Sequence, residues 1–281
     1  MDQYRRGDLV FDVLDAGPAD GPVVVLLHGF PQHNTSWQAI IARLTAAGYR
    51  CLAPNQRGYS PGARPSRRRD YRMSELVDDT LALIEASGAE RVHLVGHDWG
   101  AAVAWGVAGQ ARDRLASVAP LSVPHPAAFM RSLPRSRQGL ASWYMYFNQL
   151  PRLPERLMLG RDGSGRAMRK FLLRSGQTTV AAERDTREMV KPGALTAALN
   201  WYRAMPQADA RATGRRVRVP TLYVWSDRDF AITAKPARDT ASYVVGPYRF
   251  ENVSGASHWL PEEKPDVIAD LLLEWFAEYP V

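Results

Sequence analysis

The sequence predicts an α/β fold in which helices cover both faces of a mostly parallel sheet and a helical segment interrupts that sheet. Short apolar runs alternate with helix-length segments up to about residue 123. From 124 to 214 the chain becomes rich in Arg, Pro and Trp and contains no strand-like run, and the alternation then resumes. Alternating strands and helices are typical of βαβ units and hence of a parallel sheet. We therefore expect a core formed by residues 1–123 and 215–281, with residues 124–214 inserted as a helical cap.

The individual elements follow from apolar runs and from the glycines that end helices. Residues 22–27 form a continuous apolar run, which is typical of a strand buried on both faces. Gly48 and Gly88 mark the ends of two predicted helices. The expected strands are residues 22–27, 49–53, 91–95, a run within 115–123, 219–225 and 248–253, with a strand-like stretch near the N-terminus. The expected core helices are residues 34–47, 74–86, 100–110 and 265–279.

The composition argues against several classes of protein. With 46% hydrophobic and 23% charged residues, the chain has the balance of an ordinary soluble globular protein. No apolar run approaches the ~18 residues that a membrane span needs, and the N-terminal residues lack the apolar core of a signal peptide. We expect a cytoplasmic protein without a membrane span. Cys51, the only cysteine, is predicted to be a packed, unreactive thiol in a strand.

The net charge of +7 comes with 32 arginines and only 4 lysines. No nucleic-acid-binding motif accompanies this charge, so we do not expect a nucleic acid as partner. The densest cluster, residues 67–69, is predicted to be a solvated loop. Arg131, Arg135, Arg137 and Arg152 could favour an acidic or polyphenolic substrate, but an exposed cap surface is the simpler interpretation. The sequence does not indicate an oligomeric state.

The most informative motif is Gly96-His97-Asp98-Trp99-Gly100, which lies between an expected strand and an apolar helix. This context predicts a nucleophile elbow, a turn so tight that only small residues fit two positions before and after its centre. The turn would raise Asp98 into the site at the start of the helix, where the helix dipole and free amides favour negative charge.

An aspartate at the centre of this turn narrows the chemistry. A carboxylate that attacks a carbonyl gives a reactive anhydride, whereas attack on a saturated carbon gives an ester that water can hydrolyse. The expected electrophile is therefore the carbon of an epoxide or of a carbon–halogen bond. Two alternatives are weaker. Asp98 could merely cap the helix, but capping does not need both glycines. Ser60 could instead be the nucleophile, because residues 58–62 match the Gly-x-Ser-x-Gly pattern, but no helix is expected to follow them.

The partners of the nucleophile should follow it in the order acid, then histidine. Two acids, Asp227 and Asp229, follow the expected strand 219–225, and we favour Asp229 because it lies one turn beyond Ser226. His258 lies in the loop between the last strand and the last helix, where a catalytic base is expected. Of the other histidines, His28, His93 and His97 are interpreted as structural, and His33 and His125 are not assigned. No metal-ligand spacing is present, so we expect neither a metal nor a cofactor.

The stretch His28-Gly29-Phe30-Pro31 follows the first core strand. Its backbone is suited to an oxyanion hole, in which the amide of Phe30 would act together with the amide of Trp99.

Taken together, three motifs resemble the signatures of epoxide hydrolases of the α/β-hydrolase fold, and their spacing covers essentially the whole chain. They are residues 28–31, residues 96–100 and Gly255-Ala256-Ser257-His258-Trp259. The stretch 57–60 resembles the family's loop after the next strand, although Asn55 stands where an aspartate is usual. The resemblance implies a small-molecule epoxide as substrate and a vicinal diol as product. It also implies two cap tyrosines that donate hydrogen bonds to the epoxide oxygen.

The resemblance places the first tyrosine at Tyr144 if the motif is anchored on Gln149 and Pro151; a shifted register would give Trp143, and Tyr146 is a further alternative. The second tyrosine is Tyr202. Both could instead be aromatic packing in the cap. The expected pocket residues are Phe30, Pro31, Trp99, Tyr146, Phe147, Trp201 and Trp259.

The resemblance implies a two-step reaction. Asp98 attacks the ring carbon while Tyr144 and Tyr202 polarise the oxygen, and His258, oriented by Asp229, then activates a water that hydrolyses the ester. A haloalkane dehalogenase is the nearest alternative, but Phe30 stands where such enzymes often carry an asparagine that holds the halide. A non-catalytic ligand-binding protein on the same fold and a serine esterase are further alternatives.

Overall fold

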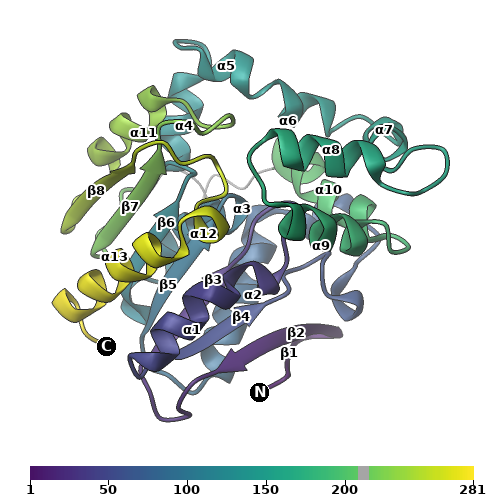
Figure 1. The fold of residues 1–281 in the computed structure, drawn as a ribbon. Helices are drawn as coiled ribbons and strands as arrows, with labels where there is room; N and C mark the ends of the chain where they lie inside the picture. Colours follow the sequence, from purple (N-terminus) through teal and green to yellow (C-terminus); the bar gives the residue numbers. More distant parts are fainter. Residues whose placement is uncertain (208–214) are drawn as a thin grey trace.

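The computed structural model of the chain describes residues 1–207 and 215–281 and contains one eight-stranded sheet, in the order β1-β2-β4-β3-β5-β6-β7-β8 (Figure 1). The strands are β1 (Gln3–Arg6), β2 (Leu9–Ala16), β3 (Val23–Leu27), β4 (Arg50–Pro54), β5 (Val92–His97), β6 (Leu115–Leu121), β7 (Thr221–Ser226) and β8 (Tyr248–Val253). Strands β1 and β2 pair antiparallel, as do β2 and β4, and all pairs from β4 to β8 are parallel. The mostly parallel sheet predicted from the sequence is confirmed.

Helices cover both faces of this sheet (Figure 1). The helices α1 (Gln38–Ala46) and α13 (Pro265–Glu278) pack on one face, and α2 (Met73–Ala86) and α3 (Trp99–Gln110) pack on the other. The central strand β3 is buried along its whole length. Val24 and Leu26 join the cluster under α1 and α13, whereas Val25 and Leu27 join the cluster under α2 and α3. Two-sided burial therefore explains the continuous apolar run in the sequence.

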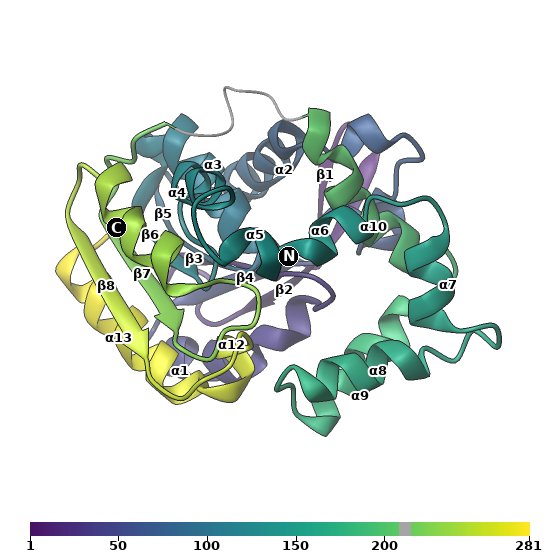
Figure 2. The same ribbon diagram turned by 90° about the horizontal axis from the view of Figure 1, so that it is seen from above.

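Between β6 and β7 the chain forms a succession of helices over the edge at which the parallel strands end (Figures 1 and 2). They are α4 (Pro126–Ser132), α5 (Gln138–Ala141), α6 (Trp143–Phe147), α7 (Leu153–Leu159), α8 (Arg166–Arg174), α9 (Thr179–Met189), α10 (Ala194–Ala204) and the 3₁₀ turn η5 (Met205–Gln207). The predicted end of the cap, at residue 214, lies outside the described residues.

Short elements connect the strands and long helices. They are the α-helices α11 (Ala234–Asp239) and α12 (Leu260–Glu263) and the 3₁₀ turns η1 (Asn34–Trp37), η2 (Pro61–Ala63), η3 (Arg68–Tyr71), η4 (Arg112–Arg114) and η6 (Thr240–Tyr243). The predicted helix 34–47 is therefore divided between η1 and α1. Among the described residues, none of the helices combines the length and the apolar character that crossing a membrane requires.

Candidate active site

Asp98 occupies a sharp turn between β5 and α3. Its backbone has φ 52° and ψ −119°, a region that a residue with a side chain rarely adopts and that costs roughly 1–3 kcal/mol. A Cβ atom on Gly96 would lie 2.2 Å from the carbonyl oxygen of Gly100, and one on Gly100 would lie 2.1 Å from the carbonyl oxygen of Leu27. Neither position has room for a side chain, which explains the glycines on both sides of Asp98.

Three loops at the carboxyl edge of the sheet bring Asp98, His258 and Asp229 together. Oδ2 of Asp98 lies 3.5 Å from Nε2 of His258, and Nδ1 of His258 lies 2.9 Å from Oδ2 of Asp229. The alternative acid, Asp227, instead accepts hydrogen bonds from Ser254 and from the amide of Gly255, at 2.9 and 2.7 Å. The acid that contacts the histidine is therefore Asp229.

The charges of this triad stabilise one another. Burial lowers the pKa of His258, but the negative charges and hydrogen bonds of Asp229 and Asp98 outweigh it and raise the pKa to about 10. Burial raises the pKa of Asp98, but hydrogen bonding to His258 and its positive charge bring it below its ordinary value. At neutral pH the unliganded site therefore holds two carboxylates and an imidazolium.

The loop after β3 supplies a backbone donor to Asp98. The amide of Phe30 donates a 2.8 Å hydrogen bond to Oδ1 of Asp98. The two chains approach so closely that a Cβ atom on Gly29 would lie 2.4 Å from Cβ of Asp98. The Phe30–Pro31 peptide bond is cis. Trp99 is the first residue of α3, a position whose amide has no partner inside the helix.

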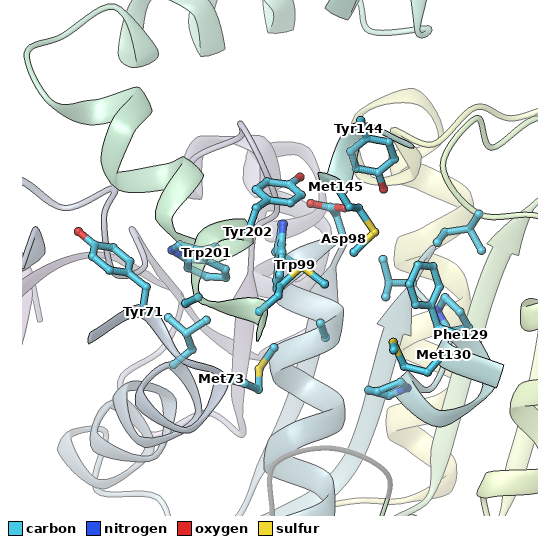
Figure 3. A pocket seen from close by; sticks show the side chains of 18 residues that line it. Tyr71, Met73, Asp98, Trp99, Phe129, Met130, Tyr144, Met145, Trp201 and Tyr202 are labelled. Carbon is cyan, nitrogen blue, oxygen red and sulfur yellow. The ribbon is translucent and has the colours of Figure 1, made fainter. Parts of the chain in front are cut away.

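Two cavities, of about 280 and 220 Å³, adjoin Asp98, and Asp98, Tyr144 and Tyr202 line both of them. Tyr144 comes from α6 and Tyr202 from α10, and Figure 3 shows their hydroxyl groups directed toward the carboxylate of Asp98. Burial, and then the negative charge of Asp98, raise the pKa of both phenols. Both tyrosines therefore stay protonated at neutral pH and can donate hydrogen bonds into the junction of the two cavities.

The walls of both cavities are almost entirely apolar. Among the described residues, Asp98 is the only carboxylate and His258 the only histidine that line them, and no arginine or lysine does. The first cavity is lined by residues such as Met73, Leu76, Phe129, Met145 and Met205, and the second by Phe147, Met158, Met168, Leu172 and Phe230. Such walls suit an uncharged ligand with apolar substituents.

The chain matches the family described as alpha/beta hydrolase fold over residues 22–265. It is 35% identical to the AB hydrolase superfamily protein YfhM of Bacillus subtilis, covering 95% of this chain and 94% of the relative. It is 34% identical to epoxide hydrolase A of Mycobacterium tuberculosis, covering 94% and 92%. This chain belongs to the epoxide hydrolase family of α/β-hydrolases. The crystal structure of epoxide hydrolase A from Mycobacterium thermoresistibile superposes with a TM-score of 0.86 at 27% identity and covers 98% of this chain and 97% of its own.

Tyr146 is a wrong prediction among the pocket residues, because it lines neither of the two cavities and is 64% exposed. Successive residues of a helix are separated by about 100°, so a residue two positions after Tyr144 points to the opposite side of α6. Trp143 lines only the second cavity. The other expected pocket residues do line a cavity. Phe30, Pro31, Phe147 and Trp259 line the second, and Trp99 and Trp201 line the first.

Sequence reasoning missed Ser122, which follows β6 and has a φ of 68°. Its hydroxyl group donates a 2.6 Å hydrogen bond to Oδ2 of Asp229 and lies 2.9 Å from Nδ1 of His258. Phe230 was also missed; its ring centroid lies 5.2 Å from that of His258. Ser122 directly follows β6, a parallel strand, and this position is the one signal in the sequence that could have indicated a site residue here.

The histidines interpreted as structural are buried in hydrogen-bonded positions. His97 lies 2.8 Å from the carbonyl oxygen of His258 and 2.9 Å from Oε1 of Gln32, so it supports the loop that carries His258. His28 accepts a 3.2 Å hydrogen bond from the amide of Gln56. His93 is hydrogen-bonded to Ser117 at 2.8 Å.

Proposed function

We propose that this chain hydrolyses an epoxide to a vicinal diol through a covalent alkyl ester on Asp98. The observation that carries the proposal is the position of the Asp98 carboxylate. It lies 3.5 Å from His258 and at the junction of two apolar cavities, with two phenols directed toward it. Several of the relatives are named epoxide hydrolases, and this supports the same reaction.

In the first step, Oδ2 of Asp98 attacks a carbon of the epoxide ring. Oδ1 is held by the amide of Phe30, so Oδ2, which has only the longer 3.5 Å contact with His258, is the oxygen that forms the new bond. The ring C–O bond breaks, and one of the phenols of Tyr144 and Tyr202 gives its proton to the departing oxygen. The products of this step are an ester of Asp98 that bears a free hydroxyl group and a tyrosinate, which regains its proton from His258 through solvent.

In the second step, water hydrolyses the ester. His258 takes a proton from the water while Asp229 and Ser122 hold its ring in place. The hydroxide attacks the carbonyl carbon of the ester, and negative charge develops on Oδ1 of Asp98. This oxygen already accepts the amide of Phe30, and the amide of Trp99 would be the second donor of the oxyanion hole. The acyl–oxygen bond breaks, and the departing alkoxide takes the second proton of the water from the new carboxylic acid of Asp98. The diol leaves, the carboxylate of Asp98 is restored, and His258 is again an imidazolium.

We propose that residues 124–207, the described part of the predicted cap, cover this site. The cap contributes both phenols and the outer walls of the cavities, whereas the core contributes the triad. The substituents on the two sides of an epoxide ring would each occupy one cavity. Substrate size and shape would therefore be selected by the cap.

A panel of substrates tests the proposal. Styrene-oxide-like, aliphatic and polycyclic epoxides are incubated with the chain, alongside haloalkanes of similar size, with the Asp98→Asn variant as control. We expect diol from at least one apolar epoxide and no halide from the haloalkanes. Release of halide without diol would instead support a dehalogenase, and tight binding of an epoxide without turnover would support a ligand-binding protein.

The two phenols should contribute separately to ring opening. We expect Tyr144→Phe and Tyr202→Phe each to lower kcat/KM by about 10- to 100-fold, because each removes one hydrogen bond to a developing negative charge. The double variant should lose about 10³-fold or more. Steady-state kinetics on one epoxide measure these effects. Tyr146→Phe is the matched control, since Tyr146 lies outside both cavities and should be silent. Full activity in the double variant would contradict the assigned role.

A further inference from the structure

The charge of the chain is concentrated in one part of the cap. Ten of its 36 basic residues, but only two of its 29 acidic residues, lie between Arg131 and Arg174. This segment therefore carries a formal charge of +8, and the rest of the chain carries −1. Within the described part of the chain, only Arg166 and Arg169 of these ten residues form a salt bridge. The other basic side chains are free to bind an anionic partner.

The same segment also exposes apolar side chains. Of the thirteen large hydrophobic side chains that are exposed among the described residues, eight lie between Met130 and Phe171. Leu140 is 80% exposed and Trp143 is 62% exposed. We call the surface formed by exposed residues of α5 to α8 and their connections the cap surface; Figure 2 shows these helices from above. Apolar groups exposed in such numbers on one surface mark an interaction site.

The cap surface surrounds the mouth of the second cavity. Trp143, Leu157 and Phe171 line this cavity, and all three are at least half exposed. The same cavity is lined at its inner end by Asp98 and His258. Among the described residues, Asp98 and His258 are the only acidic or basic ones that line this cavity, so an apolar ligand entering at its mouth would meet mainly apolar walls until it reaches the site.

We propose that the cap surface docks on an anionic lipid bilayer, with the mouth of the second cavity turned toward the membrane. Tryptophan and tyrosine favour the headgroup level, and leucine and phenylalanine side chains would enter the outer acyl region. The arginines would bind lipid phosphates. An apolar epoxide dissolved in the bilayer would then reach Asp98 directly. This last step rests on the proposed function, whereas docking itself does not.

The charge distribution favours this occupant over a second copy of the chain. A symmetric dimer through the cap surface would bring two segments of charge +8 into contact, and like charges repel. An anionic membrane instead supplies opposite charge and an apolar phase together. The mixture of free arginines and exposed leucine, tyrosine and tryptophan side chains matches both properties.

Vesicle co-sedimentation of the full chain tests the proposal. One set of vesicles is pure phosphatidylcholine, and in the other phosphatidylglycerol replaces about a third of the lipid. We expect the partition coefficient to be at least about tenfold higher for the anionic vesicles at low salt and to fall as salt is added. Equal binding to both sets, or no binding to either, would overturn the proposal.

Paired variants locate the docking surface. Leu140→Ser with Tyr146→Ser removes exposed apolar area, and Arg137→Glu with Lys170→Glu reverses two charges; none of these residues lines either cavity. We expect both pairs to lower binding to anionic vesicles. For the charge-reversal pair, binding should fall by about fivefold or more for each basic residue lost.

Matched control pairs on the core are Val245→Ser with Val267→Ser and Arg91→Glu with Arg238→Glu, all at exposed positions. They should bind vesicles as the parent does. A control pair that weakens binding as much as its cap counterpart would contradict the location. The chain could instead form a dimer that does not bind vesicles. If the double substitution Leu140→Ser with Tyr146→Ser then made it monomeric, a second copy of the chain would be the occupant of the surface. Turnover of a water-soluble epoxide checks folding separately, so loss of docking and loss of the proposed reaction are distinguishable.

Discussion

Replacing Asp98 with asparagine is expected to lower epoxide turnover by about 10⁴-fold or more, because the proposed reaction has no other nucleophile. Asparagine has nearly the same size, and its oxygen can still accept the amide of Phe30. Size matters here, because the backbone of Gly29 lies against the side chain of Asp98. The variant should therefore fold and bind substrate while losing the first step. Diol formation under saturating substrate measures the loss.

Asp227→Asn is the matched control for this variant. Asp227 is also an aspartate in a loop at the carboxyl edge of the sheet, but its contacts are to Ser254 and Gly255. Its replacement changes the net charge by the same amount and should leave turnover within about threefold. Near-normal turnover in Asp98→Asn would remove the basis of the mechanism.

A reaction in heavy-oxygen water tests the formation of the Asp98 ester in the chain without substitutions. In the proposed mechanism hydrolysis breaks the acyl–oxygen bond, so the diol from the first turnover should carry an oxygen that came from Asp98. The oxygen of heavy-oxygen water should appear first in Asp98 and only later in product. Peptide mass spectrometry of residues around Asp98 measures this. Direct transfer of label to the first diol would mean that water attacks the epoxide without a covalent ester.

The site was predictable from sequence wherever local sterics determine it. Gly96 and Gly100 border the turn because the backbone comes too close for a Cβ atom, so the motif itself carries the information. The same is true of β3, whose burial on both faces gives a run without polar residues. The choice of Asp229 over Asp227 rested on the position of Asp229 one turn beyond Ser226, the last residue of β7, where its side chain was expected to face the site.

Other features depend on contacts between distant segments. Ser122 reaches Asp229 and His258 because β6 lies beside β7, and no motif near Ser122 signals this. Tyr146 was misassigned because α6 spans only residues Trp143–Phe147, which is too short for periodicity to show which side faces the cavities. The antiparallel strands β1 and β2 were indicated only as a strand-like stretch, since their burial pattern is interrupted by exposed or half-buried residues.

The second large effect is expected from His258→Ala, which should stop the reaction at the ester. In the unliganded site Asp229, and then Asp98, outweigh burial and raise the pKa of His258 to about 10, so the imidazole is protonated and cannot act as a base. In the proposed reaction, formation of the ester removes the negative charge of Asp98. Loss of a neighbouring negative charge lowers the pKa of His258, and the site thereby gains its base only after the first step is complete.

Without the imidazole, hydrolysis of the ester should slow by about 10²- to 10⁴-fold, while ring opening by Asp98 continues. Intact-protein mass spectrometry should then show a stoichiometric increase by the mass of the epoxide. His258 also keeps the pKa of Asp98 low, and burial would raise that pKa once the cation is removed. The adduct should therefore be sought over a series of pH values that extends above neutral, and its yield should rise as the carboxylate of the variant ionises.

The double variant Asp98→Asn with His258→Ala is the control, and it should form no adduct. In the unchanged chain, breakdown of the ester should accelerate as pH rises through the lowered pKa of His258 in the ester, because only the neutral imidazole accepts a proton from water. In His258→Ala this acceleration should be absent. Release of diol by His258→Ala at the parent rate, without a detectable adduct, would mean that a different group activates water and that the contact between His258 and Asp98 serves only to hold the carboxylate in its charged form.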